Sequence, residues 1–459
     1  MNIIIKSNYI LPFFLFLIVI FLLTLFMITE IGVMERVCLP FLTTFLIATI
    51  IYLLLQAICK DKFISKIYLI SVLMHYIFIL FWDFLKYHLM GMSIPTDNIY
   101  IPFIIDNDGM RYHSAGVYLN NHFNFNYFTA KMSGGLFPKI IGVVYHYFGN
   151  NPFIISCINT TTAGFTAVLY YLIGKTTFDN INIAKMFALV SIANFSHIMN
   201  TSTLMRDNYI VLFMYLSLYF SYYFYKTKKL LPLVCTFISL YGLYLFREYA
   251  AFVTLFAIIF TFIYLNLTIR KNGNIIKSNI LSIILIISAP LIILCLIILF
   301  TKMTLFFNIF STTDLITIRE TAYSGSSTDF AFDFMKLYKI FPLLPFVIGY
   351  ICMFFSPFPW EWILVRRIIY VPDMLTLYCF LLSFFKNVKK ILTEKQYFPV
   401  VFFFSIIFMF SIYCFTLGNS GSIHRLRGPF LAMIYLIAMV RPDKFLVKIL
   451  NQIQKWRIV

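Results

Sequence analysis

The chain has 459 residues, of which 61% are hydrophobic and only 12% charged, and its formal net charge is +18 at pH 7. A folded protein of this composition could not keep its apolar residues away from water, so the water-soluble class is excluded and a polytopic membrane protein is indicated. Lys and Arg stand in short clusters at the ends of apolar runs, where membrane-orientation signals lie, which argues against nucleic acid as a partner.

Apolar runs of about 20 residues, the length that crosses the hydrocarbon core of a bilayer, recur along the whole chain. The predicted fold is therefore all-α, a polytopic transmembrane helical bundle of about 12 spans held in the lipid bilayer. The first run precedes Thr29 and Glu30 and not a small-residue cleavage site, as in a retained span. The expected spans are 10–28, 37–58, 67–85, 152–174, 183–203, 208–225, 230–246, 249–269, 279–301, 372–386, 397–416 and 428–440.

Two stretches outside these spans are expected to lie at the outer face. The apolar run 341–355 has only fifteen residues and two prolines, so it is too short for an untilted span. Residues 337–371 are therefore expected to form a re-entrant or interfacial hairpin, and residues 136–149 an amphipathic helix. The predicted segments are a three-span segment (1–90), a large loop with this helix (91–151), a six-span bundle (152–301), a second large loop with the hairpin (302–371), and three spans with a tail (372–459).

The distribution of positive charge predicts the orientation, because basic residues near span ends stay in the cytoplasm. With the N-terminus inside, the inner loops hold 21 of the 36 basic residues and only four acidic residues. The outer loops then hold 15 basic and 14 acidic residues, and both termini are cytoplasmic. Chemically active groups are thus expected at the outer face.

Arginine supplies nine of the fifteen outer basic residues, whereas Lys dominates the inner loops. A guanidinium matches phosphate oxygens two at a time and is costly beside hydrocarbon unless it has a partner. The pattern favours a phosphate-bearing lipid as ligand, although Arg206 with Asp207 and Arg247 with Glu248 could also neutralise each other at tight turns. The candidate lipid-phosphate-binding residues are Arg206, Arg247, Arg319, Arg425 and Arg427.

The first outer loop carries two carboxylates, Asp106 and Asp108, in the densest polar patch of the chain. They could share a divalent cation such as Mg²⁺ or Mn²⁺, or one could act as a general base. A plain turn is the third interpretation, since Asp-Asn-Asp-Gly is also a strong turn sequence. No third His or Cys stands at metal-ligand spacing. The candidate substrate-binding residues of the outer face are His113, Trp360, Glu361 and His424.

A series of outer-face motifs follows this acidic loop. They are Phe-Pro-Lys-Ile-Ile-Gly-Val-Val-Tyr-His-Tyr-Phe-Gly-Asn-Asn-Pro (137–152), Leu-Tyr-Tyr-Leu-Ile-Gly-Lys (169–175), Thr-Leu-Met-Arg-Asp-Asn (203–208), Phe-Arg-Glu-Tyr (246–249), Ser-Gly-Ser-Ser (324–327), Pro-Phe-Pro-Trp (357–360) and Gly-Asn-Ser-Gly-Ser-Ile-His-Arg-Leu-Arg (418–427). Their order resembles the GT-C superfamily of polytopic glycosyltransferases, in particular its family-39-like bacterial members.

This resemblance, over roughly residues 95–440, implies a catalytic activity and roles for residues. A carboxylate of the first outer loop would be the catalytic base or a metal ligand, here Asp106 or Asp108. Outer arginines, here Arg206, Arg247 and Arg425 or Arg427, would hold the phosphate of a polyprenyl-linked sugar. Three spans precede the acidic loop where the family usually has one, which leaves open which Asp matches the family's base.

The richness in Phe, Ile, Asn and Lys, with a dozen spans and large outer loops, is also similar to bacterial O-antigen and capsule polymerases. These enzymes join repeat units linked to undecaprenyl diphosphate at the periplasmic face. Both resemblances imply a multi-pass inner-membrane glycosyltransferase of surface-polysaccharide or lipopolysaccharide biosynthesis, with other assembly proteins of the membrane as partners. They differ in whether one sugar or a whole repeat unit is moved.

A flippase that moves a lipid-linked oligosaccharide without chemistry is the alternative from another class. It would need charges inside the spans, facing a central cavity, and often two halves that repeat each other. Almost all charges lie at the ends of the predicted spans, with Asp83 as the main exception, and no halving of the pattern is visible.

Overall fold

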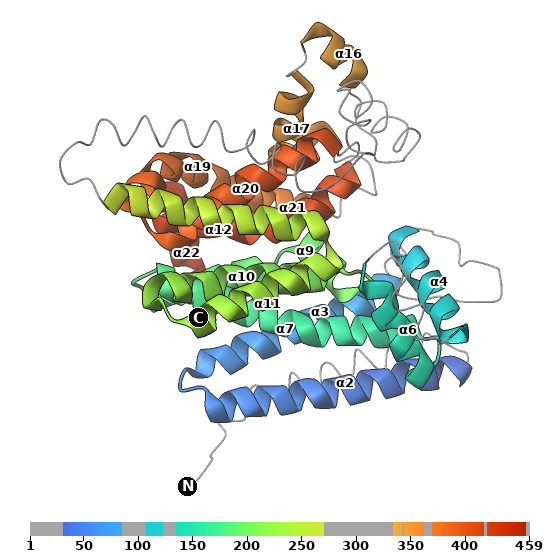
Figure 1. Cartoon of the computed structure of the whole chain (residues 1–459). Coiled ribbons are helices and arrows are strands. Elements are labelled where there is room, and N and C mark those ends of the chain that lie inside the picture. Colours follow the sequence, from blue (N-terminus) through green and yellow to red (C-terminus); the bar gives the residue numbers. More distant parts are fainter. Residues whose placement is uncertain are drawn as a thin grey trace. The chain divides into compact units, whose positions relative to one another are not determined.

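The computed structural model describes residues 31–84, 107–122, 135–269, 334–341, 344–361, 370–416 and 420–455 (Figure 1). Every regular element in these ranges is a helix, so the all-α prediction is confirmed for the described part of the chain. The chain forms two compact units: unit 1 comprises Met1–Val168 and Ile198–Leu212, and unit 2 comprises Leu169–His197 and Phe213–Val459.

Six helices of the described residues are long and apolar enough to cross a membrane, which indicates a polytopic membrane protein. A bent pair, α8 with α9, would add a seventh span. The number of twelve stays a prediction, because 10–28 and 279–301 lie outside the described residues and three other expected spans form helices that are shorter or less apolar. The six are Pro40–Ile58, Lys62–Ile79, Pro152–Thr177, Glu248–Leu265, Tyr397–Cys414 and Ser422–Val440.

In unit 1 a helical hairpin packs against the first part of a long helix. Phe41 of the first helix and Tyr68, Val72 and Tyr76 of the second lie in one apolar cluster with Phe153 of the long helix. The Tyr76 hydroxyl donates a hydrogen bond of 2.7 Å to the Thr44 hydroxyl, which satisfies both groups inside the apolar core. The helices of unit 1 are α2 (Ile31–Ile58), α3 (Lys62–Phe84), α4 (Asn107–Asn121), α6 (Phe137–Phe148) and most of α7 (Pro152–Thr177).

Two helices lie within the first large loop expected from the sequence, residues 91–151. The sequence indicated one helix in this loop, 136–149, whereas the structure has a further helix, α4, which begins at Asn107. The expected amphipathic helix 136–149 is present as α6, and its apolar face, with Ile141, packs on α4. Tertiary packing against α6 therefore supports the helical state of the short polar segment α4.

Unit 2 is a helical bundle in which α20 packs against α12, α17 and α21, and α19 packs against α21. Residues 337–371 contain no long helix among their described positions. Instead α16 and α17 are short, and the twelve residues of α17 extend only about 18 Å, too little to cross the bilayer. The helices of unit 2 are α8 (Ile181–Ile192), α9 (Phe195–Ser202), α10 (Asp207–Thr227), α11 (Leu230–Phe246), α12 (Glu248–Ile269), α16 (Phe334–Ile340), α17 (Leu344–Phe355), η2 (Pro359–Glu361), α19 (Val371–Glu394), α20 (Tyr397–Thr416), α21 (Ser420–Val440) and α22 (Lys444–Lys455), with α9 and α10 contributing residues to both units.

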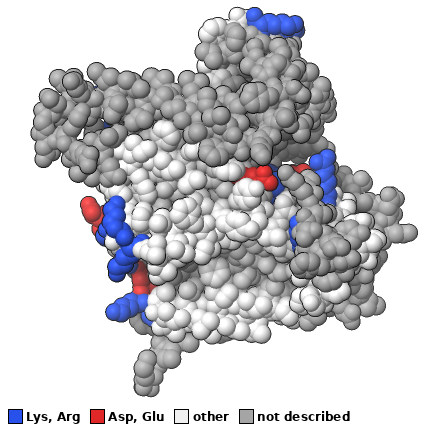
Figure 2. Space-filling model, in the orientation of Figure 1, with Lys and Arg blue, Asp and Glu red and all other residues white. Residues whose placement is uncertain are grey.

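The charged ends of the unit 2 helices are segregated. At one end, the Tyr264 hydroxyl of α12 donates to the Leu392 carbonyl of α19, beside the Lys-rich end of that helix. At the other end, the rings of Tyr249 and Tyr413 lie 6.3 Å apart and join the start of α12, with Arg247, to the end of α20. Figure 2 shows Lys and Arg side chains in small groups, beside broad areas of other residues. Within unit 2, Arg247 thus lies at the opposite end of α12 from the Lys-rich end of α19. Which of these ends faces the cytoplasm stays a prediction.

Candidate functional site

The first candidate residues lie at the start of α4 in unit 1. Asp108 stands in the first turn of α4, where a carboxylate interacts favourably with the helix dipole. Its side chain is 39% exposed and lies 3.9 Å from the Arg111 guanidinium, one turn later. An exposed pair at this distance is weak, and the Asp108 carboxylate is partly accessible to solvent. Asp106 lies outside the described residues.

His113 joins α4 to α6. Its Nδ1 lies 2.8 Å from the Tyr145 hydroxyl, and both side chains are buried. Burial lowers the pKa of His113 below its ordinary 6.5 and raises the pKa of Tyr145 above its ordinary range. Both groups are therefore neutral at pH 7, and His113, predicted to bind substrate, lies in the contact between two helices.

Two glycines allow these helices to approach closely. A Cβ on Gly116 would lie 2.3 Å from Ile141 of α6, and a Cβ on Gly142 would lie 2.7 Å from Leu119 of α4. Only glycine fits at both crossing points without displacement. The α4–α6 pair is thus a close-packed platform that carries Asp108 at one end.

Arg206 reaches this platform from a segment about a hundred residues further along the chain. Its guanidinium carbon lies 5.9 Å from the centre of the Tyr112 ring, within the range of a cation–π contact. Tyr112 follows Asp108 by four residues and so lies on the same side of α4. The structure therefore brings Asp108 and Arg206, two residues singled out from the sequence, to the same face of one unit.

Asn159 of α7 holds the backbone on which Arg206 stands. Its fully buried amide donates to the carbonyls of Thr203, at 2.6 Å, and Met205, at 3.1 Å. The Asn208 amide donates in return to the Asn159 carbonyl, at 2.8 Å. These hydrogen bonds fix the chain on both sides of Arg206, so Asn159 is a positioning residue whose role the sequence did not disclose.

The second group of candidates lies at the start of α21 in unit 2, where Arg427 is almost completely buried. Its Nη1 donates to the carbonyls of Met353, at 3.0 Å, and Ser356, at 2.9 Å. Its Nη2 lies 2.9 Å from both the Met374 sulfur and the Nδ1 of His424. The two carbonyls belong to the C-terminal end of α17, which lacks intrahelical donors. Arg427 therefore caps α17 with the charge that the helix dipole favours there.

Asp373 caps the opposite kind of helix end, the N-terminus of α9. Its carboxylate accepts hydrogen bonds from the backbone N–H groups of Phe195, at 2.7 Å, and Ser196, at 2.6 Å, and from the Ser196 hydroxyl. The Asn194 side chain accepts from the His197 N–H, at 2.9 Å. The first three N–H groups of α9 are thus satisfied at the break where α8 and α9 bend by 62°. Asp373 and Arg427 also attract each other electrostatically.

Stacked aromatic rings lie in the segments around this buried polar group. The Tyr370 ring stacks on the His424 ring with centroids 4.0 Å apart, which fixes His424 beside Arg427. Trp360 stacks on Phe358 at 4.7 Å and is 69% exposed. Arg425 is partly exposed, in contrast to Arg427. Of the residues predicted near 424–427, Arg425 is the one whose guanidinium can meet a ligand without breaking a helix cap.

The remaining predicted residues lie apart from these two groups or outside the residues that the structure describes. Arg247 is buried, with its guanidinium carbon 5.7 Å from the centre of the Tyr249 ring. Arg319 lies outside the described residues, and only the backbone of Glu361 is described. Convergence of the unit 1 and unit 2 residues on one cavity stays a prediction.

A divalent cation finds no complete ligand set in the described part of the chain. Its residues contain no group of three or more His, Cys, Asp or Glu side chains that could hold a metal. Asp108 would supply one carboxylate, and the Arg111 guanidinium lies 3.9 Å from it. A cation shared by Asp106 and Asp108 stays a prediction, because Asp106 lies outside the described residues.

The sequence analysis missed Asp373 and Tyr145. Asp373 was the one carboxylate in the predicted span 372–386, and a charge within a span is costly unless it has partners, which was an available signal. Nothing in the sequence distinguished Tyr145 from the other 30 tyrosines. No protein-family model, curated protein or solved structure matches this chain.

Proposed function

We propose that the chain is an integral membrane glycosyltransferase or polymerase that forms glycosidic bonds in bacterial surface-polysaccharide biosynthesis. Its donor would be a sugar or repeat unit linked to a polyprenyl phosphate or diphosphate, and its active face would be the periplasmic side of the inner membrane. The predicted orientation, the outer arginines and the order of motifs 137–427 support the proposal.

The observation that carries the proposal is the placement of Asp108 and Arg206 on one side of α4. Transfer from a lipid-linked sugar needs a proton acceptor for the attacking hydroxyl and a cation for the departing phosphate. Asp108 is partly exposed, and Arg206 lies over Tyr112, one helical turn away. A carboxylate and a guanidinium in one neighbourhood match these two requirements.

In the proposed reaction, Asp106 or Asp108 accepts the proton of an acceptor hydroxyl. The hydroxyl oxygen forms a bond to the anomeric carbon as the bond between that carbon and the phosphate oxygen breaks. The released lipid phosphate takes the electron pair of the broken bond, and Arg206 stabilises its negative charge. In unit 2, Arg427 would act by holding α17 in place, and Arg425 stays a candidate for binding phosphate.

A lipid-linked oligosaccharide flippase is the second candidate. Buried charges among the helices, here Asp373 and Arg427, are what transport across the membrane requires. Both side chains, however, bind the ends of helices α9 and α17, which accounts for their burial without a transported ligand. The transferase is therefore favoured.

The test replaces Asp106 and Asp108 separately with Asn in the native membrane. Asp179→Asn is the matched control, because Asp179 is exposed and lies in a predicted inner loop. After membrane insertion is verified, the surface polysaccharide is compared by electrophoresis. We expect one of the two outer variants to lose polymer and the control to keep it.

The product that remains when polymer is lost distinguishes a polymerase, a single-sugar transferase and a flippase. Single-repeat lipopolysaccharide indicates a polymerase, and a core that lacks one sugar indicates a single-sugar transferase. Lipid-linked repeat units that accumulate on the cytoplasmic face indicate the flippase. Full-length polymer in both Asp variants would remove the catalytic assignment.

A further inference from the structure

One end of unit 2 carries a dense group of exposed basic side chains on the ends of α10, α19, α21 and α22. We call these ten residues the basic collar. Two acidic residues beside the collar are each in an ion pair with one of its members, Glu394 with Arg441 at 2.5 Å and Asp443 with Lys386 at 3.7 Å. The collar therefore has a large positive excess. Its members are Lys226, Lys228, Lys229, Lys386, Lys389, Lys390, Lys395, Arg441, Lys444 and Lys448.

Helix ends from several segments meet at the collar. The rings of Tyr225 and Tyr397 lie 5.4 Å apart and join the end of α10 to the start of α20. The Lys228 ammonium lies 4.5 Å from the centre of the Tyr225 ring. Tyrosines beside lysines at the ends of apolar helices are typical of the boundary between hydrocarbon and headgroups. The collar thus lies where a bilayer surface would meet unit 2.

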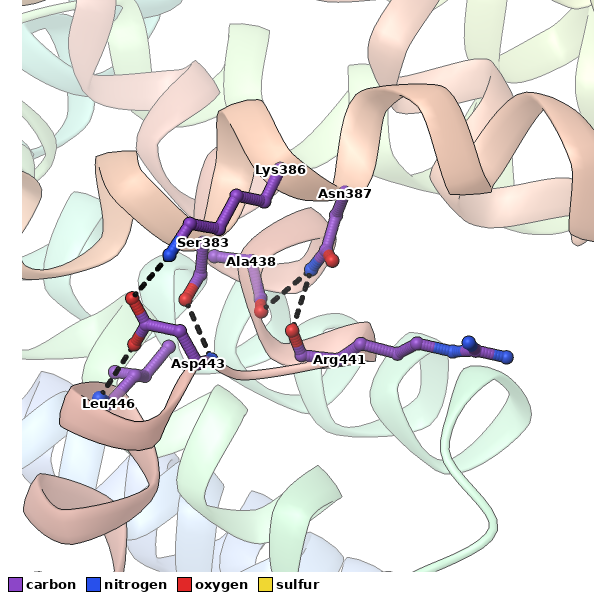
Figure 3. A network of polar contacts seen from close by, with 7 residues as sticks. All are labelled: Ser383, Lys386, Asn387, Ala438, Arg441, Asp443 and Leu446. Carbon is purple, nitrogen blue, oxygen red and sulfur yellow. Dashed lines mark hydrogen bonds and ion pairs between the residues drawn. The ribbon is translucent and has the colours of Figure 1, made fainter.

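A polar network fixes the chain between α21 and α22 (Figure 3). The buried Asn387 amide of α19 donates to the carbonyls of Ile437, Ala438 and Arg441, at 2.9 to 3.1 Å. These carbonyls end α21 and would otherwise lack donors. The chain therefore leaves α21 in a defined direction, against α19.

Asp443 then starts α22 at a defined place. Its backbone N–H donates to the Ser383 hydroxyl of α19, at 3.0 Å, and its carboxylate accepts from the Leu446 N–H, at 2.9 Å. The same carboxylate faces Lys386, as Figure 3 shows. An Asp that accepts from the third residue of a helix is an N-cap, so α22 is anchored to the bundle at its first turn.

The exposed side of α22 combines apolar and basic residues. Leu446 and Leu450 are buried, whereas Phe445 is 55% exposed. Lys444 and Lys448 are exposed and lie one helical turn apart, next to Phe445. An anchored helix with an exposed aromatic residue beside lysines is typical of one that lies in the plane of a membrane surface.

We propose that the basic collar and α22 form a binding surface for the anionic phospholipid headgroups of one leaflet. Lys444 and Lys448 would contact lipid phosphates, and Phe445 would enter the boundary with the acyl chains. The positive charge of the collar is complementary to anionic lipid headgroups, which form the negative surface at the ends of membrane-spanning helices. The inference does not depend on the catalytic proposal above.

The test measures hydrogen exchange of the α22 amides, 444–455, in the full-length chain. The chain is placed in nanodiscs of phosphatidylcholine alone and in nanodiscs in which about a third of the lipid is phosphatidylglycerol. We expect slower exchange of α22 in the anionic membrane and a smaller difference at high salt. Equal exchange in the two membranes would overturn the proposal and would favour a soluble acidic partner as the occupant.

A charge variant gives the second arm. Each lysine near an anionic surface contributes about fivefold to membrane affinity, so Lys444→Gln with Lys448→Gln should reduce the lipid-dependent protection by up to about 25-fold. Lys336→Gln with Lys339→Gln, the matched control on exposed positions of α16, should keep it. An equal loss in both variants would refute the assignment to α22. The comparison of the two membranes uses the unmodified chain, so it stands even if a variant folds poorly.

Discussion

Replacement of Arg427 by Met should destabilise unit 2 strongly, although Met retains much of the side-chain length. The substitution removes the donors of the Met353 and Ser356 carbonyls, and each buried carbonyl without a donor costs about 1–3 kcal/mol. It also leaves the buried Asp373 carboxylate without the nearby positive charge, and such a loss typically costs about 3–5 kcal/mol in all. The two estimates describe overlapping effects, so the expected loss is about 4 kcal/mol.

The assay is denaturation of the purified full-length chain in mixed detergent micelles, followed by circular dichroism. Arg425→Met is the matched control, because Arg425 is partly exposed two residues away, and it should lose at most about 1 kcal/mol. Hydrogen exchange should become faster around 353–356 in the Arg427 variant only. A loss below about 1 kcal/mol, with unchanged exchange in that segment, would refute the capping role.

Three further changes test the packing and the pH response. Burial lowers the folded-state pKa of His113 below the 6.5 of the unfolded chain. The stability of the folded state should therefore be full above about pH 6.5 and fall as the pH decreases below it. His113→Gln should reduce this fall in a pH series of thermal unfolding. Gly349→Ala should lower the free energy of unfolding by about 1–3 kcal/mol, because the new Cβ would lie 2.8–2.9 Å from Cys414 of α20. Gly428→Ala is the control: its Cβ would make only an ordinary contact at 3.9 Å, so it should be tolerated in the same thermal assay. Asn159→Ala should lower the free energy of unfolding by about 2–3 kcal/mol. It should also weaken the binding of undecaprenyl phosphate in a titration, since the backbone around Arg206 would lose the hydrogen bonds that fix it. An unchanged affinity would show that Asn159 does not position the phosphate site.

The sequence predicted the apolar helices well, because span length depends on hydrocarbon thickness alone. The expected runs 230–246 and 397–416 coincide with α11 and α20. The span 183–203 is instead broken between α8 and α9, at a point with neither Pro nor Gly. Asn194 is an N-cap residue type and gave a local signal, but the carboxylate that stabilises the break comes from Asp373, far along the chain.

The candidate residues were predictable by type but not by orientation. His424 and Arg427 are three residues apart, so their contact follows from helical periodicity. That Arg427 points inward to α17 while Arg425 stays partly exposed depends on packing that no local pattern encodes. Likewise α4 has a polar sequence in which no helix was expected, and its helical state is supported by the fit of Gly116 and Gly142 against α6.

The charges of Asp373 and Arg427 cannot be interchanged, whereas those of an ordinary ion pair can. Each residue faces a helix terminus of opposite sign, the carboxylate the amino end of α9 and the guanidinium the carboxyl end of α17. If the two residues were exchanged, each would meet a terminus of its own sign, although their mutual attraction would be preserved. Charge reversal at both positions therefore cannot rescue either single reversal, and the bundle permits only one of the two arrangements of these charges.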